Sequence, residues 1–204
     1  MIQTPQQIKR QEILSVTDRI LKKEKVQLAA ISLIAKQDIK VNYTSTDFSL
    51  EIKDPKKTII TLNDKRGKGF VDSLFIGLHE FFSPTYHSLN NIELCDFKVN
   101  PSLSSSRNKI GTDAQASITL SMHVKSHGIA EFHHKSRSIM NSVFIAILKV
   151  FEFYINCEKS FFKIQEFIKE ARSRNRGDVV NNYIYDLCKI TEANTYDEKK
   201  RERN

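Results

Sequence analysis

The stretch GKGFVDSLFIGLHEFF, residues 67–82, marks the point where the chain changes from strand to helix. Its two glycines, Gly67 and Gly69, predict a tight turn, and the apolar residues after them recur at helical spacing. These apolar residues are Val71, Leu74, Phe75, Leu78 and Phe82. Ser83-Pro84 then ends the predicted helix.

The residues before this turn predict a β-meander. Residues 27 to 62 are partly alternating and rich in β-branched residues, which is typical of strands. The meander is expected to end near Asn63, with a turn at residues 54–57; its first segment is also compatible with a helix. The strand segments are QLAAISLIAK (27–36), IKVNY (39–43), DFSLEIKD (47–54) and KTIITLND (57–64).

The same order of strands and helix follows a second time. Residues 92–101 predict a strand in which Leu94 alternates against Phe97, so the two would face opposite sides. A long strand over 113–126, a turn at His127-Gly128 and a return strand lead into a helix over 136–156. We therefore expect an α+β fold of two strand-strand-(strand)-helix units, packed as a pseudo-twofold domain.

Helices are also predicted at both ends of the chain. Residues 5–25 form an amphipathic pattern, and two further helical patterns cover residues 161–171 and 179–187. The last segment, 193–204, is polar and is predicted to be disordered.

Composition favours a reduced, cytoplasmic protein. The three cysteines form no CxxC pair, and the N-terminus has no apolar segment of a signal peptide. No apolar run approaches the length of a membrane span. The net charge of +8 is compatible with nucleic-acid binding, but much of the excess lies near the chain ends, which favours solvated faces instead.

Three motifs in order resemble the C-terminal regulatory domain of 2-isopropylmalate synthase and citramalate synthase. GKGFVDSLF (67–75) resembles that family's GxGPVDA turn and helix, and GTDAQASITL (111–120) resembles its G-D-D-A-x-A strand opening. SRSIMNSVFIAILKVFEFYIN (136–156) resembles the segment that leads into the last helix. The resemblance covers about residues 38 to 156.

The resemblance implies a dimer with leucine or isoleucine bound as feedback effector near the interface. Backbone N–H groups at a glycine turn and helix N-terminus would hold the carboxylate of the amino acid. The implied ligand-binding residues are Gly67, Gly69 and Val71, with Leu94 and Phe97 as a second wall and Ala114 keeping the pocket small. The family's proline is Phe70 here, which is large enough to fill the pocket.

The chain carries no recognisable catalytic centre. The family's catalytic barrel needs 200 or more residues, and we find no His-x-His metal pair, G-x-S-x-G elbow or P-loop. We therefore expect no catalytic residue, metal site or cofactor in this chain, although it could belong to a synthase and its status as an enzyme stays open.

The expected layout is a linker helix (1–30), a regulatory-like domain (31–156), a helical extension (157–192) and a disordered tail (193–204). The expected partners are a second copy of the chain, a branched-chain amino acid and a branched-chain synthase, and no membrane. A dimeric scaffold without ligand and a basic nucleic-acid-binding module are the alternatives.

Overall fold

The computed structural model describes residues 4–102 and 115–197. Its first unit is an antiparallel sheet of β1 (Gln27–Asp38), β2 (Tyr43–Asp54) and β3 (Lys56–Gly67), followed by α2 (Phe70–Phe82). The apolar side of this helix packs on the sheet, with Leu74, Leu78 and Phe82 buried. The predicted change from strand to helix at Gly67 is confirmed.

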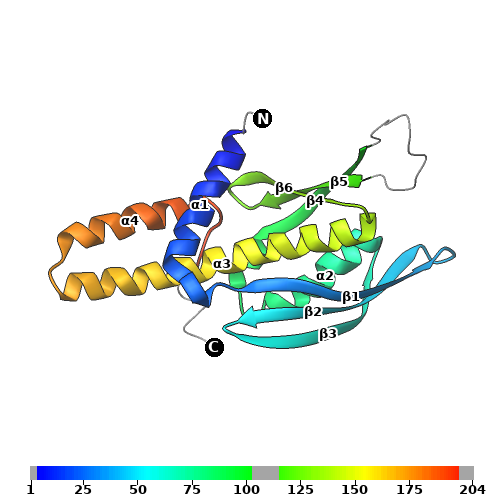
Figure 1. Cartoon of the computed structure of the whole chain (residues 1–204), viewed down its shortest axis with the longest axis horizontal. Helices are drawn as coiled ribbons and strands as arrows, with labels where there is room; N and C mark the ends of the chain where they lie inside the picture. Colours follow the sequence, from blue (N-terminus) through cyan, green and yellow to red (C-terminus); the bar gives the residue numbers. More distant parts are fainter. Residues whose placement is uncertain (1–3, 103–114, 198–204) are drawn as a thin grey trace.

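The second unit repeats this order. A short 3-10 turn (His87–Asn91) leads into a second antiparallel sheet of β4 (Ile92–Ser102), β5 (Gln115–Val124) and β6 (Gly128–Ser136). The helix α3 (Ile139–Ser173) follows, and Figure 1 shows it running between the two sheets. The α+β fold with two three-stranded units, each followed by a helix, is confirmed.

Helices at the two ends of the chain complete the fold. The helix α1 (Pro5–Leu21) packs on α3 and on α4 (Gly177–Thr191). A capping box starts α1: the Thr4 side chain accepts from the Gln7 backbone, and the Gln7 side chain accepts from the Thr4 backbone. Figure 1 shows α4 lying beside the C-terminal half of α3.

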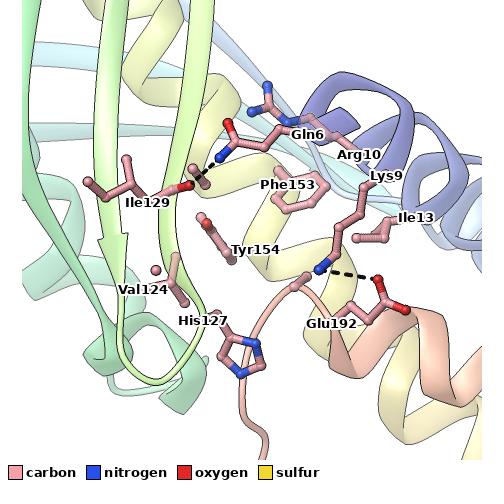
Figure 2. Close-up of a pocket in the computed structure, with 13 residues that line it drawn as sticks. Gln6, Lys9, Arg10, Ile13, Val124, His127, Ile129, Phe153, Tyr154 and Glu192 are labelled. Atoms are coloured by element: carbon pink, nitrogen blue, oxygen red, sulfur yellow. Dashed lines mark hydrogen bonds and ion pairs between the residues drawn. The ribbon is translucent and has the colours of Figure 1, made fainter. Parts of the chain in front are cut away.

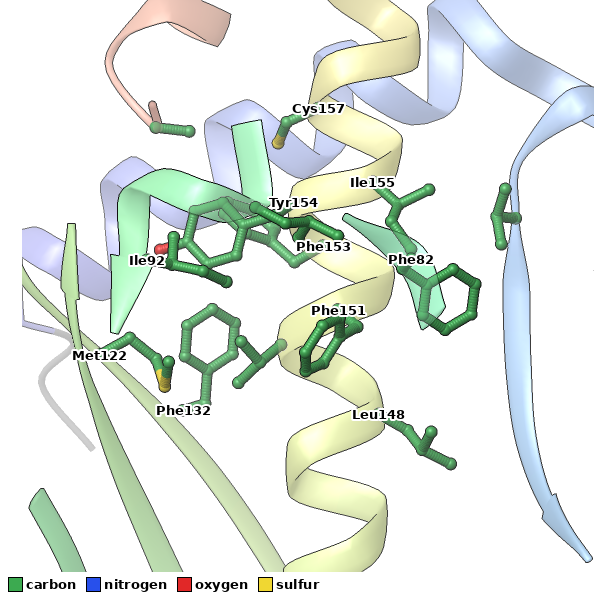
Figure 3. Packing of buried hydrophobic residues seen from close by; sticks show 14 of the residues in the cluster. Phe82, Ile92, Met122, Phe132, Leu148, Phe151, Phe153, Tyr154, Ile155 and Cys157 are labelled. Atoms are coloured by element: carbon green, nitrogen blue, oxygen red, sulfur yellow. The ribbon is translucent and has the colours of Figure 1, made fainter. Parts of the chain in front are cut away.

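Aromatic residues on α3 join the two units into one core. Phe151 is fully buried, and its ring centroid lies 5.4 Å from that of Phe75 on α2. Two residues later, Phe153 lies 5.7 Å from Phe132 of β6, with its ring in an edge-to-face arrangement. Figure 3 shows Phe151 and Phe153 leaving α3 in different directions. Each such aromatic pair adds about 0.5–1.5 kcal/mol of stability beyond the burial of its rings. Since α3 pairs with α2 of the first unit and with β6 of the second, it links the two units.

Residues 39–42 are a turn, and of the predicted strand at 39–43 only Tyr43 belongs to a strand, as the first residue of β2. The carboxylate of Asp38 accepts hydrogen bonds from the backbone N–H groups of Lys40 (2.9 Å) and Val41 (3.1 Å). Asn42 adopts a φ of 55°, which this residue type tolerates in turns. The alternative of a helix at the first segment is wrong, since β1 is a strand of 12 residues.

A single helix replaces the two helices predicted on either side of Cys157. No glycine or proline occurs from residue 136 to residue 176, so nothing in the sequence ends the helix before Ser173. The predicted boundary between residues 156 and 157 therefore falls inside α3. This helix is long and apolar enough to cross a membrane, but 67% of its apolar window is buried within the protein, as in a core helix.

The segment after α4 is ordered as far as residue 197, against the prediction of a disordered tail. Ala193 and Asn194 are buried. The Asn194 side chain donates to the carbonyl oxygen of Ser88 (2.8 Å) and accepts from the Asn91 side chain (3.2 Å). Residues 198–204 lie outside the described part of the chain.

Candidate functional site

Gly67 lets the end of β3 approach the first turn of α2 closely. A Cβ at this position would lie 2.5 Å from the backbone nitrogen of Ser73 and 2.8 Å from its Cα. Both atoms belong to the helix backbone, so a side chain could be accommodated only by moving the helix. The predicted tight turn therefore has a steric reason at Gly67.

Gly69 leaves the N-terminus of α2 open. It is the N-cap residue, no side chain caps the helix, and a Cβ there would meet no atom within 4 Å. Its φ of −156° is extended backbone that any residue adopts. The carboxylate of Asp72 instead accepts from the backbone nitrogen of Lys68 (2.9 Å). Helix N-termini of this kind attract anionic groups.

Phe70 and Val71 follow on the first turn of α2. Both are half-buried and pack against the hydrophobic core. Phe70 therefore has part of its ring in the core.

Leu94 and Phe97 share one face of β4, although strict alternation puts them on opposite faces. The register shifts between Leu94 and Asp96, so that Leu94 pairs with Met122 and Phe97 pairs with Leu120. Met122 and Leu120 are buried, and the two predicted wall residues are half-buried beside them. The bulge is the physical reason for the difference.

Ala114, the remaining predicted site residue, lies outside the described residues. The prediction of a single pocket that joins Gly67, Gly69 and Val71 to Leu94 and Phe97 stays a prediction. The cavities at α1 and α3 that follow are lined by other residues.

A first cavity, of about 170 Å³, lies between α1, the β5–β6 hairpin, α3 and the segment after α4. Figure 2 shows Lys9 pointing across it to Glu192, with the ammonium and carboxylate 3.2 Å apart. The Gln6 amide donates to the carbonyl oxygen of Ile129 (3.2 Å). Burial raises the pKa of the Tyr154 hydroxyl, which keeps this group neutral. Most polar groups of this cavity are thus already paired within the protein.

A second cavity, of about 290 Å³, shares Arg10 and Phe153 with the first. It lies between α1, β6 and α3, and cationic side chains from three parts of the chain reach it. The cations are Arg10, Lys25 and Lys149, and the apolar lining is Leu14, Phe132 and Phe153. The sequence did not reveal this cavity, because its residues come from segments more than 100 positions apart.

Metal-binding groupings are absent from residues 4–102 and 115–197, where no three His, Cys, Asp or Glu side chains could hold a metal ion. The adjacent His133 and His134 have different partners: the Thr119 hydroxyl (2.9 Å) and the Lys149 ammonium (3.0 Å), respectively. Burial and the neighbouring Lys149 lower the pKa of His134.

Comparison with known proteins leaves the family open. No protein-family model matches the chain, and no curated protein matches it either.

Proposed function

We propose that the chain is a non-catalytic regulatory and dimerisation module that binds a branched-chain amino acid, leucine or isoleucine, at the turn before α2. The observation that carries this proposal is the helix N-terminus at Gly69, where no side chain caps the helix and a Cβ would meet no atom of a more distant residue within 4 Å. The carboxylate of an amino acid fits the backbone N–H groups there, and the helix dipole favours its charge.

The second part of the ligand, its branched side chain, needs an apolar wall. In this proposal Val71 would supply one wall on the first helical turn, and Leu94 and Phe97, which share one face of β4, would supply a second. Selectivity among branched-chain amino acids would be modest, since one methylene contributes only about 1–3 kcal/mol.

Dimerisation is supported by the outer surface of the first sheet. β1 is an edge strand that pairs only with β2, and on it only the backbone N–H of Leu28 is recorded as donating to α3, to the Glu152 carboxylate (3.1 Å). Ile31 and Ile34 on this strand are 52% and 57% exposed. A second copy of the chain over this surface would remove both side chains from water.

The test of amino-acid binding is thermal unfolding of the full chain with leucine, isoleucine or valine at millimolar concentration. A ligand at 100 times its dissociation constant adds about 2.7 kcal/mol, which raises the midpoint by roughly 5–10 °C at about 2–4 °C per kcal/mol. We expect this shift with one branched-chain amino acid.

Two tryptophan variants locate the binding. Gly69→Trp fills the open space at α2 and should abolish the shift. Gly177→Trp is the matched control, because Gly177 also lies at a helix N-terminus with no atom within 4 Å of a Cβ. No shift of the wild-type chain with any of the three amino acids would refute the ligand part of the proposal and leave a ligand-free scaffold.

Two further measurements address the partners. Light scattering on the eluting protein should give the mass of a dimer, and a monomer at micromolar concentration would refute the dimerisation part. If a branched-chain synthase is the partner, adding the purified chain should change its rate in an amino-acid-dependent way. An unchanged rate would exclude regulation in trans.

A further inference from the structure

The cavity between α1, β6 and α3 contains an arginine, Arg10, that forms no ion pair with any described residue. The Arg10 guanidinium donates a hydrogen bond to the carbonyl oxygen of Glu131 and lies 4.0 Å from the centroid of the Phe132 ring. Among the described residues, no carboxylate oxygen lies within 4.0 Å of its nitrogens. The backbone carbonyl and the ring orient the guanidinium, but neither neutralises it.

Burial makes this arrangement unfavourable for the protein alone. Desolvation lowers the pKa of Arg10, and the nearby Tyr154 hydroxyl and Glu131 carboxylate offset this effect only in part. A half-buried cation without an anionic partner loses hydration and gains no ion pair in return. An anion bound in the cavity would provide the missing pair.

The other charges around the cavity are also mainly positive. Lys149 contacts the neutral ring nitrogen of His134 (3.0 Å) and forms no ion pair in the described part of the chain. Lys25 is neutralised by Asp18, with 2.6 Å between ammonium and carboxylate. Glu152 is the one carboxylate that lines this cavity, and it accepts from the backbone nitrogen of Leu28 (3.1 Å). Arg10 and Lys149 therefore have no ion-pair partner among the described residues, and the charge of Glu152 offsets only one of these two cations.

We propose that this cavity binds a small organic dicarboxylate, with one carboxylate on the Arg10 guanidinium and the other beside Lys149. The planar fork of an arginine matches a carboxylate in two parallel hydrogen bonds. The carbon chain between the two charges would lie on Phe132, Phe153 and Leu14. A volume of about 290 Å³ suits a ligand of a few carbon atoms, since pockets for drug-sized ligands measure about 300–1,000 Å³.

This inference does not depend on the amino-acid site at Gly69, because the two sites share no residue. The probe is succinate, titrated into the full chain by calorimetry in buffer whose ionic strength is matched with sodium chloride. Butyrate tests the need for the second carboxylate, and inorganic phosphate tests whether any small anion suffices. We expect succinate to bind at least about tenfold more tightly than either of these.

Two matched lysine variants decide whether the cavity is the site. Lys149→Gln should weaken succinate binding about tenfold or more. Lys169→Gln, an exposed lysine farther along α3, should leave the affinity unchanged. Arg10→Gln should also abolish binding; if that variant does not fold, the exposed Lys149 still provides the test.

Three results would overturn the proposal. The first is no heat and no change in the protein's NMR spectrum at saturating succinate. The second is equal affinity of succinate for the Lys149→Gln and Lys169→Gln variants. The third is phosphate or butyrate binding as tightly as succinate, which would replace a dicarboxylate site with a general anion site.

Discussion

Replacing Gly67 by alanine should destabilise the fold although it adds only one methyl group. The new Cβ would lie 2.5 Å from the backbone nitrogen of Ser73 and 2.8 Å from its Cα. Ordinary contact needs about 3.5–4.0 Å, so the first turn of α2 must move outward by roughly 1 Å. Overpacking of this kind costs about 1–3 kcal/mol. For a chain of 204 residues this lowers the midpoint of thermal unfolding by roughly 2–12 °C.

The assay is urea unfolding of three alanine variants followed by circular dichroism. Gly67→Ala should show the full loss, whereas Gly177→Ala, where a Cβ meets no atom within 4 Å, should equal or exceed the wild type in stability. Gly69→Ala also meets no atom, but it replaces the N-cap glycine of α2 and should lose less stability than Gly67→Ala. Alanine also reduces the entropy of the unfolded chain, which acts in favour of all three variants. If Gly67→Ala proved as stable as Gly69→Ala, the close approach of β3 to α2 would be refuted.

Three further changes test other contacts. Glu158→Gln should lower the free energy of unfolding by about 1–3 kcal/mol, because the buried carboxylate accepts hydrogen bonds from the backbone N–H (2.9 Å) and the hydroxyl (2.5 Å) of Ser88. Urea unfolding measures this loss, and the control Glu93→Gln, at an exposed side chain, should leave the stability unchanged. Asn194→Ala should cost a similar amount by the same assay, because the Ser88 carbonyl oxygen loses its donor. It should also speed hydrogen exchange at Thr195, whose backbone N–H donates to the Asn194 side chain (2.8 Å); an unchanged midpoint would contradict the ordered tail. Burial raises the pKa of Cys157 to about 12 from 9.0. Above pH 9 the thiol ionises in the unfolded chain but stays protonated in the folded protein. The free energy of unfolding should therefore fall above pH 9 by up to about 1.4 kcal/mol per pH unit. Cys157→Ala should reduce that alkaline slope, and an identical slope would show that the thiol is not buried.

The sequence predicts those parts of the fold that depend on local periodicity. Alternation identifies the buried face of β5, and Ile118, Leu120, Met122 and Val124 are all buried. Helical spacing after Gly69 identifies the buried face of α2 equally well. In each element one face contacts the core, so the spacing of apolar residues along the chain is enough to predict which side chains are buried.

Features that depend on contacts between distant segments were not predicted. The bulge beside Leu94 changes the pairing partner by one residue, and nothing in the alternating apolar pattern of β4 marks it. Arg10 looks like any basic residue on an amphipathic helix, and its unusual environment arises only from Phe132 and the Glu131 carbonyl, more than 120 positions away. The tail prediction failed for a related reason: Asn194 is polar, yet its side chain completes hydrogen bonds with Ser88 and Asn91 inside the fold.

The continuity of α3 has a consequence for how the protein can be divided. A helix of 35 residues is about 52 Å long, and both sheets as well as α1 and α4 pack along it. A fragment that stops at residue 156 would lack the C-terminal part of α3, with the buried Ile164 and Ile168, and would lack α4. It would therefore expose the surface of α1 that now packs on α4. Proteases should therefore release few stable intermediates, and the sheets and terminal helices should lose their amide protection together on unfolding.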